Sequence, residues 1–363
     1  MYVIQLLLGE IMSILAITGI VVLATVLVIL VWLNFRHRSD DHSQYDQPVP
    51  PLMKAASEIS SQHLNVVKKL NVFTAKSTTN IKARRQQMDD FFAQSVDSQI
   101  IPVVAGGVSA EWVLAEGANP DQRLLYIHGG AFLVGSPKSH RYIASELSRL
   151  AGVSVLSIAY RMQPEFKTIN CHEDCRIAYD WILNNGPKEQ TPVKHLFVAG
   201  DSAGGNLTLA LIAWARDNGL RQADGAIALA PVTDSTFSSP SLTTNIKSDP
   251  FLGPAMGKIV KMPRFFLRSI MSIGAGRSVN DPEISPLLGD LSNLPPTLVQ
   301  VSQDEMLFND SLRYANKAIS QHGDVTLQIW PTMVHVFQGF GPDLPEANDA
   351  LGHIRDFIRS KLS

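Results

Sequence analysis

The sequence contains little cysteine. Its 363 residues include only Cys171 and Cys175, whose spacing of four places them one turn apart on one face of a helix. Neither a second cysteine pair nor a histidine at ligand spacing accompanies them, which argues against a zinc site. We therefore expect two free thiols and a reducing compartment.

The sequence also lacks a strong excess of charge of either sign. The formal net charge is -2, and charged residues make up 18% of the chain. This balance gives no electrostatic basis for binding nucleic acid. With 45% hydrophobic residues, the chain is long enough for one large globular domain and additional segments.

Charge is absent altogether from residues 11–33, which are mostly Ile, Leu and Val. Twenty apolar residues in a helix span the hydrocarbon core of a bilayer, so this run predicts a transmembrane anchor within residues 1–34. A cleaved signal peptide is disfavoured because no basic region precedes the run and no clear cleavage site follows it. A buried core helix would carry a polar stripe, which is missing here.

The orientation of the anchor is predicted from the basic residues beside it. Arg36, His37 and Arg38 follow the apolar run, whereas the short N-terminal side offers only Glu10 and the α-amine. The positive-inside rule then places the bulk of the chain in the cytoplasm. Residues 35–51, which end in several prolines, are expected to form a tether.

Downstream of the tether, the pattern predicts an α/β fold. Residues 52–98 are helix-like, residues 99–233 and 289–363 alternate apolar runs with amphipathic stretches, and residues 234–288 are expected to be an insertion over the sheet. Continuous apolar runs are typical of strands buried on both faces, and their alternation with helices predicts a mostly parallel sheet of about eight strands. The predicted strands are 99–104, 109–114, 124–128, 153–159, 195–199, 226–230, 297–301 and 325–330, and the helices 139–150, 172–185, 203–218, 308–321 and 346–361.

One glycine-flanked serine lies between an apolar strand and an apolar helix. The segment Gly200-Asp201-Ser202-Ala203-Gly204 has the pattern G-x-S-x-G. A nucleophilic serine projects from a sharp strand-to-helix turn, where neighbouring backbone comes so close that only glycine fits two residues before and after it. Ser202 is therefore the candidate nucleophile, and a glycine-rich turn that merely packs is the alternative.

A second glycine-rich loop follows an earlier apolar run. In His128-Gly129-Gly130-Ala131, small residues would let backbone N–H groups point into a site and hold a developing oxyanion. We assign these donors to Gly129, Gly130 and Ala203, with Ala131 as a further possibility. The ring of His128 is expected to hold the loop by hydrogen bonds rather than to react.

The general base must be chosen among ten histidines. In this type of site the chain order is serine, acid and then histidine, which leaves His322, His335 and His353. His322 ends a predicted helix and His353 lies within the last one. His335 follows the last strand, at the edge of the sheet where reactive groups gather, and is the candidate base.

The acid that would orient this base follows the seventh predicted strand. Asp304 and Glu305 both lie just beyond the strand end, while Asp310 is better placed to cap the next helix. Residue types and spacing do not separate Asp304 from Glu305.

Together these motifs resemble the hormone-sensitive-lipase-like family of α/β-hydrolases, over roughly residues 99–360. The matching segments are His128-Gly-Gly-Ala-Phe, Tyr160-Arg-Met-Gln-Pro-Glu165, Gly200-Asp-Ser-Ala-Gly-Gly-Asn206, Ser285-Pro-Leu and His335-Val-Phe. Alignment on Leu307 places the family's acid at Glu305, a departure from the usual aspartate. The resemblance implies an α/β-hydrolase fold with a helical cap, built from residues 52–98 and 234–288.

The resemblance implies a serine carboxylesterase or lipase that cleaves short- to medium-chain acyl esters through Ser202, Glu305 and His335, without a cofactor or metal. A lactonase, deacetylase or amidase would use the same residues. A non-catalytic binding protein on a hydrolase scaffold would be expected to lack a member of the triad. The expected partners are a small-molecule ester and a lipid bilayer through residues 11–33, and the oligomeric state is open. Phe265 and Phe266 could line the pocket entrance or pack within the cap.

Overall fold

The structure is a computed structural model that describes residues 2–36, 41–47, 60–76 and 78–362. Its centre is an eight-stranded sheet with the order β1-β2-β4-β3-β5-β6-β7-β8. β1 and β2 pair antiparallel, β2 also runs antiparallel to β4, and the remaining neighbours are parallel. The strands are β1 (Gln99–Ala105), β2 (Val108–Leu114), β3 (Asn119–Ile127), β4 (Val153–Ile158), β5 (His195–Asp201), β6 (Gly225–Leu229), β7 (Thr297–Ser302) and β8 (Val325–Trp330).

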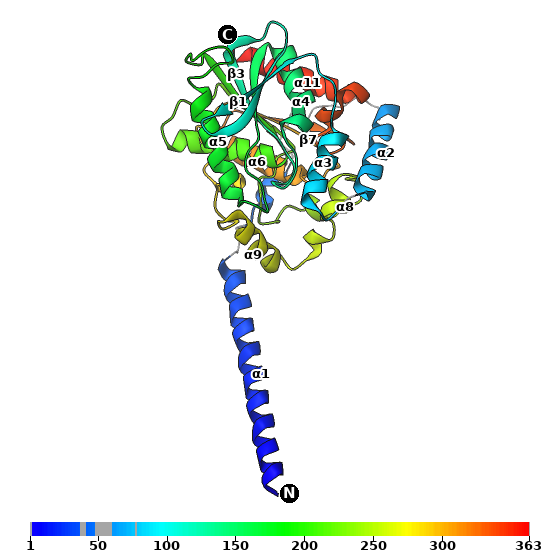
Figure 1. Cartoon of the computed structure of the whole chain (residues 1–363), viewed down its shortest axis with the longest axis vertical. Helices are drawn as coiled ribbons and strands as arrows, with labels where there is room; N and C mark the ends of the chain where they lie inside the picture. The colour runs from blue at the N-terminus through cyan, green and yellow to red at the C-terminus, as the bar shows by residue number, and fades with distance from the viewer. Residues whose placement is uncertain (1, 37–40, 48–59, 77, 363) are drawn as a thin grey trace.

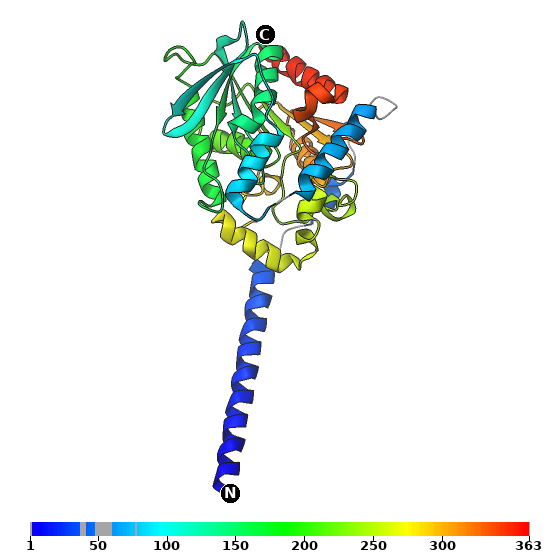
Figure 2. The ribbon, with the colours of Figure 1, turned by 45° about the vertical axis from the view of Figure 1, so that its right-hand side comes forward.

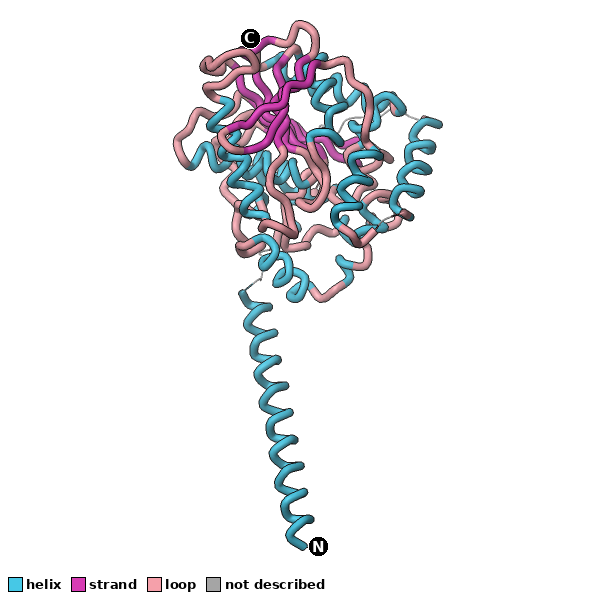
Figure 3. The backbone as a smooth tube through the Cα atoms, in the orientation of Figure 1, coloured by secondary structure: helices cyan, strands magenta, loops and turns pink. Residues whose placement is uncertain are grey.

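Helices cover both faces of this sheet, as Figures 1 and 3 show. α4 and α11 pack on one face, and α5, α6 and α10 pack on the other. The five helices are α4 (Pro137–Ala151), α5 (Thr168–Ile182), α6 (Ala203–Asp217), α10 (Phe308–Ser320) and α11 (Pro345–Ser360). The predicted α/β fold is confirmed, and each predicted strand and core helix lies within a few residues of an observed one.

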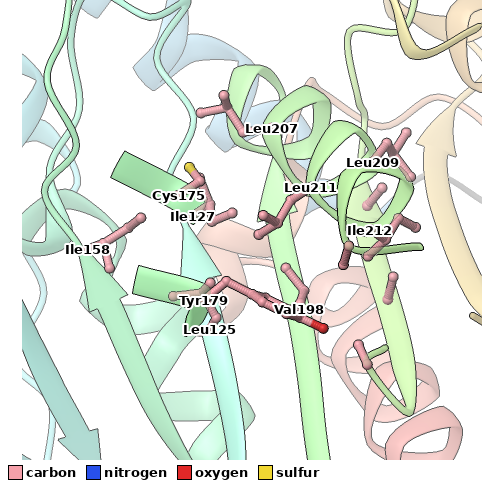
Figure 4. Close-up of a cluster of buried hydrophobic side chains, with 14 of the residues drawn as sticks. Leu125, Ile127, Ile158, Cys175, Tyr179, Val198, Leu207, Leu209, Leu211 and Ile212 are labelled. Atoms are coloured by element: carbon pink, nitrogen blue, oxygen red, sulfur yellow. The ribbon is translucent and has the colours of Figure 1, made fainter. Parts of the chain in front are cut away.

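The larger core fills the space between the sheet and α5, α6 and α10. Figure 4 shows its centre, where Leu211 of α6 points toward Val198 of β5 and Ile127 of β3; Leu125 and Leu207 belong to the same cluster. These side chains are almost fully buried. Burying a leucine contributes roughly 1.5–3 kcal/mol, so this core holds the β5–α6 connection firmly in place. Cys171 and Cys175 are free and buried in the same core, as predicted.

The two segments expected to cover the sheet are helical. Residues 52–98 contain α2 (Ser61–Ala75) and α3 (Ile81–Phe91), and β1 begins at Gln99. Residues 234–288 contain α7 (Ser241–Thr244), α8 (Leu252–Met256), a 3₁₀ turn at Ile259–Lys261 and α9 (Arg264–Ala275). In Figure 1, α2, α3 and α8 lie on one side of the domain, and α9 lies at its lower end, beside α1. We call the described parts of these two segments the cap.

The apolar N-terminal run is helical but extends beyond its predicted bounds. It forms part of α1 (Tyr2–Arg36), which projects from the globular domain in Figures 1 and 2 and exposes apolar side chains such as Ile14, Leu23 and Val28. In the described part of the chain, no helix has both the length and the apolar character needed to cross a membrane. The predicted transmembrane anchor, residues 1–34, is therefore not confirmed; the side chains of its residues 1–9, 27 and 30–34 lie outside those that the structure describes.

The described part of the predicted tether is attached to the domain. Ser43–Tyr45 form a 3₁₀ turn against α10. Asp46 accepts two hydrogen bonds from the guanidinium of Arg313, at 2.6 and 2.7 Å, and Arg313 is almost fully buried. The sequence predicted a tether over 35–51. Its described residues 41–47 lie against α10, because the buried cation of Arg313 requires an anionic partner and Asn316 donates to the carbonyl of Tyr45.

Candidate active site

The candidate nucleophile lies at the turn between β5 and α6. Ser202 has φ 53° and ψ -115°, a backbone conformation that L-residues rarely adopt. The turn is secured from both sides, because the Ser202 N–H donates to the carbonyl of Leu229 at 2.7 Å and the Ser202 carbonyl accepts from the N–H of Val232 at 3.2 Å. Strain held by such contacts is typical of functional turns.

The flanking glycines are required by close backbone approach. A Cβ on Gly204 would lie 2.0 Å from the carbonyl oxygen of Ile127, and a Cβ on Gly200 would lie 2.4 Å from the carbonyl oxygen of Gly204. Neither clash can be relieved by a side-chain rotation, since both involve backbone atoms. The interpretation of G-x-S-x-G as a crowded strand-to-helix turn therefore agrees with the observed geometry.

The structure brings Glu305 and His335 together. Nδ1 of His335 lies 3.0 Å from Oε1 of Glu305, and both side chains are buried. The other carboxylate oxygen, Oε2, accepts a hydrogen bond from the N–H of Ser302 at 3.1 Å. This second contact fixes the carboxylate at the end of β7. A carboxylate on Nδ1 favours the tautomer whose other nitrogen, Nε2, is free to accept a proton.

Asp304, the alternative acid, faces elsewhere. Its side chain lines a separate cavity of about 400 Å³, together with His63 and Asp249, and its backbone carbonyl accepts a hydrogen bond from Oγ of Ser248. Of the two candidate acids, only Glu305 contacts His335.

Burial and pairing shift the protonation of this pair. Burial raises the pKa of Glu305 and is opposed by the nearby imidazole. Burial alone would lower the pKa of His335, but the carboxylate of Glu305 outweighs it and raises the pKa above the ordinary value of 6.5. The imidazolium that would form during proton transfer is thus stabilised.

The two glycine-rich segments meet at a cavity. Gly130 and Ala131 line it together with Ser202 and His335, and its volume is about 70 Å³. Gly130 and Ala131 have φ values of 118° and 56°, so the loop after β3 turns sharply with its backbone at the cavity wall. A Cβ on Gly130 would lie 2.0 Å from the carbonyl oxygen of Val134.

The N–H group of Gly129 has a different partner from the oxyanion that the sequence predicted. Its N–H donates to Oδ1 of Asp201 at 3.0 Å, so this donor is already engaged by a buried carboxylate. The prediction of Gly129 as an oxyanion donor is therefore corrected. Sequence spacing identified the loop but could not show which N–H groups it turns toward the cavity.

Asp201 is the centre of a buried hydrogen-bond network that the sequence analysis missed. Its carboxylate accepts hydrogen bonds from Oη of Tyr126 at 2.7 Å and from Gly129 N, and Nε2 of His140 lies 3.3 Å away. Burial would raise the pKa of Asp201, but His140 and Tyr126 outweigh it and lower that pKa. The signal available in the sequence was an acidic residue next to the nucleophile, because a buried charge requires partners.

His140 also lines the cavity with Ser202, but both of its ring nitrogens are engaged. Nε2 faces Asp201, and Nδ1 lies 3.0 Å from Oγ of Ser139 and 3.2 Å from the carbonyl oxygen of Ser136. A histidine held at both nitrogens has no free site for the proton of Ser202, so His140 is not a competing base.

His128 has the structural place that was expected of it. Its Nδ1 lies 2.8 Å from the carbonyl oxygen of Gly129, and its ring stacks on Tyr160 with the centroids 4.3 Å apart. Oη of Tyr160 donates to the carbonyl of His128 at 2.8 Å. Burial lowers the pKa of His128 to about 3, so the ring is neutral and supports the loop.

The cap holds the acid-bearing loop in place. Asp249 accepts hydrogen bonds from the N–H groups of Phe251 and Leu252 and, through its other oxygen, from the N–H of Met306. The amide of Asn245 donates to the carbonyl of Glu305 at 2.9 Å. Cap residues 245–252 are therefore joined directly to the loop that carries Glu305, and Phe251 and Leu252 line the cavity.

Comparison with known proteins agrees with this geometry. Residues 124–339 match the family described as alpha/beta hydrolase fold. The chain is 35% identical over 259 residues to an acetyl-hydrolase of Streptomyces hygroscopicus, covering 71% of this chain and 82% of that protein. It is 33% identical over 274 residues to an esterase of Acinetobacter venetianus, covering 76% and 86% respectively. A crystal structure of an esterase from the bacterial hormone-sensitive lipase family superposes with a TM-score of 0.74 at 31% identity, covering 84% of this chain and all of that one.

The fold and the comparisons thus define a class, the α/β-hydrolases. Within it, this chain belongs to the hormone-sensitive-lipase-like family and is an esterase of the carboxylic-ester-hydrolase type.

The contact between Glu305 and His335 can be tested by changing the acid. We expect Glu305→Gln to lower kcat by about 10³–10⁴-fold, because an amide on Nδ1 no longer stabilises the imidazolium and can favour the wrong tautomer. The proton-accepting form of His335 is neutral, so kcat/KM of the unmodified enzyme should fall as pH drops through a value above 6.5. Loss of the carboxylate should move the acid limb of any residual activity to lower pH.

Asp304→Asn is the matched control, and the two variants are compared by their pH–rate profiles with a nitrophenyl ester. The Asp304→Asn variant should keep both kcat and the acid limb of the unmodified enzyme, because Asp304 lines the other cavity. A large loss in Asp304→Asn with little loss in Glu305→Gln would contradict the assignment.

Proposed function

We propose that this enzyme hydrolyses short-chain acyl esters through a Ser202–His335–Glu305 triad and an acyl-enzyme intermediate. The observation that carries this proposal is one cavity lined by Ser202, His335, Gly130 and Ala131, with Glu305 held on the far nitrogen of the His335 ring. The similarity to an acetyl-hydrolase and to esterases supports the same chemistry.

In the proposed first step, Nε2 of His335 accepts the proton of Ser202 while Oγ attacks the ester carbonyl carbon. The carbonyl oxygen becomes an oxyanion. We assign its donors to the backbone N–H groups of Gly130, Ala131 and Ala203, since Gly129 already serves Asp201. Each donor placed at the oxyanion contributes about 3 kcal/mol to the barrier reduction.

The intermediate then collapses and releases the alcohol. His335 returns the proton to the leaving alkoxide, which leaves an acyl group on Ser202. A water molecule repeats the sequence, giving its proton to His335 and attacking the acyl carbon. The carboxylic acid leaves, and Ser202 regains its proton.

The size of the cavity favours a small acyl group. Its volume of about 70 Å³ lies well below the roughly 300–1,000 Å³ of pockets that hold drug-sized ligands. Its walls include apolar side chains from both the core and the cap, among them Ile143 and Leu252. A small, apolar cavity of this kind favours acetyl to butyryl chains over longer ones.

Replacement of the nucleophile is the direct test of the triad. Ser202→Ala should lose nearly all turnover of p-nitrophenyl acetate and all covalent labelling by a fluorophosphonate, because the attacking oxygen is removed. Ser320→Ala, on the exposed end of α10, is the matched control and should keep both. Labelling of Ser202→Ala at another serine, with activity retained, would refute the proposal.

The acyl preference can be measured with a series of p-nitrophenyl esters. We expect kcat/KM to be highest between acetyl and butyryl and to fall at octanoyl. Leu252→Ala should shift the optimum to longer chains, because it enlarges the cavity at the cap side. Leu288→Ala removes a partly buried leucine that packs elsewhere on the core and should leave the profile unchanged. An octanoyl optimum in the unmodified enzyme would contradict the size argument. A second panel of substrates, made up of lactones, acetamides and anilides, separates the alternative acyl-transfer activities.

We further propose that α1 holds the enzyme at a membrane, with the esterase domain on the cytoplasmic side. The support is the exposed apolar side chains described between Ile11 and Ile29, which water solvates poorly, and the basic residues of the sequence Arg36-His37-Arg38 at the end of the helix. The full chain should then stay with the membrane fraction through an alkaline carbonate wash, and protease added outside sealed cells should leave the domain intact. Release of the full chain by the wash would overturn this proposal.

A further inference from the structure

Helix α9 of the cap carries a stripe of apolar side chains on the face that is exposed to solvent. Its inner face buries Leu267 and Ala275, whereas Phe266, Ile270 and Ile273 are 45%, 46% and 74% exposed. The spacing of these three residues, i, i+4 and i+7, places them on one side of the helix. Phe266 therefore does not pack inside the cap, one of the two places that the sequence suggested, and it is not among the residues that line the cavity of Ser202.

The surroundings of this stripe are basic. Residues 254–277 include five Lys or Arg residues and no Asp or Glu; of these, Arg268 is buried and Arg277 forms ion pairs with Asp281 and Glu283. Lys258, Lys261 and Arg264 are exposed beside the stripe, and within the described residues no ion pair neutralises them. The 3₁₀ turn Ile259–Lys261 adds a further apolar side chain, because Ile259 has an exposed fraction of 43%.

We propose that α9 and the preceding turn, residues 258–273, form a docking surface for an anionic lipid bilayer. Apolar side chains on one face with Lys or Arg beside them are the composition by which a helix binds in the plane of a lipid interface. Each cation near an anionic surface adds about a five-fold gain in affinity. A second copy of the chain is a poorer occupant, since it would bring the same three cations against the first set.

The position of α9 fits this occupant. In both Figure 1 and Figure 2, α9 lies beside the end of α1 nearest the domain, and the two helices contact each other. Val28 and Ile29 of α1 are exposed as well, so one lipid surface would cover both elements. Docking would place the cap, whose residues Phe251 and Leu252 line the cavity, next to the bilayer. The inference rests on exposed side chains and charge and does not depend on the esterase activity.

A probe on α9 of the full chain tests the docking. Ile273→Cys, labelled with an environment-sensitive fluorophore, reports contact with lipid, and Val104→Cys on β1, 65% exposed, is the matched control. The native cysteines are buried and should not react in the folded protein. With vesicles of phosphatidylcholine and phosphatidylglycerol, we expect a blue shift at position 273, a smaller one with phosphatidylcholine alone, and none at position 104.

Charge reversal separates lipid docking from other causes. Adding Lys258→Glu, Lys261→Glu and Arg264→Glu to the labelled chain should raise the concentration of anionic vesicles needed for half the shift by at least 100-fold. The proposal is overturned by no shift at position 273, by equal shifts at positions 273 and 104, or by a vesicle concentration for half the shift that charge reversal leaves unchanged, which would show that α1 alone brings position 273 to the lipid. It is also overturned by a shift without vesicles that grows with protein concentration, which would identify a second copy as the occupant.

Discussion

The site depends on one steric constraint, the close approach of the β5–α6 turn to the end of β3. Gly204 lies so near the carbonyl oxygens of Ile127 and His128 that a Cβ would meet them at 2.0 and 2.6 Å. This approach fixes the strained Ser202 relative to the loop that follows β3, so the proposed nucleophile and the backbone at the cavity wall are positioned by the same contact. Such preorganisation avoids the cost of rearranging dipoles during the reaction.

Three further layers support this arrangement. Beneath it, Asp201 joins the two segments by accepting hydrogen bonds from Tyr126 and Gly129. Beside it, Glu305 orients His335 from the end of β7. Above it, Asp249 and Asn245 connect the cap to the acid-bearing loop. Ser202, Glu305 and His335, the proposed triad, come from distant parts of the chain. Hydrogen bonds to neighbouring strands and loops hold them, and a site built on loops keeps its geometry in this way.

Much of this could be predicted from the sequence because the signals are local. Buried parallel strands read as apolar runs, and the tight turn at Ser202 requires glycine at fixed spacing, so the sheet, the strand-to-helix turn and the position of His335 followed directly. The choice between Asp304 and Glu305 could not be made from neighbouring residues. It depends on which side chain turns toward a loop 30 residues away. Family alignment pointed to Glu305, and the observed contact agrees.

The features that were missed are set by long-range partners. The N–H of Gly129 is engaged by Asp201, which lies 72 positions further along the chain. Residues 41–47 are held by α10, through Arg313 and Asn309 on Asp46 and Asn316 on Tyr45. The outward apolar stripe of α9 could not be predicted for a similar reason, since periodicity shows that a helix is amphipathic but not which face meets the core.

The central claim is that one reacting carbon is contacted by Ser202, by His335 and by the N–H groups of Gly130, Ala131 and Ala203. A crystal structure of the enzyme inhibited by a phosphonate ester tests this claim most directly. We predict phosphorus bonded to Oγ of Ser202, one phosphoryl oxygen within hydrogen-bond distance of those three N–H groups, and Nε2 of His335 within reach of Oγ. A phosphoryl oxygen bound elsewhere, or an imidazole turned away from the adduct, would contradict the account.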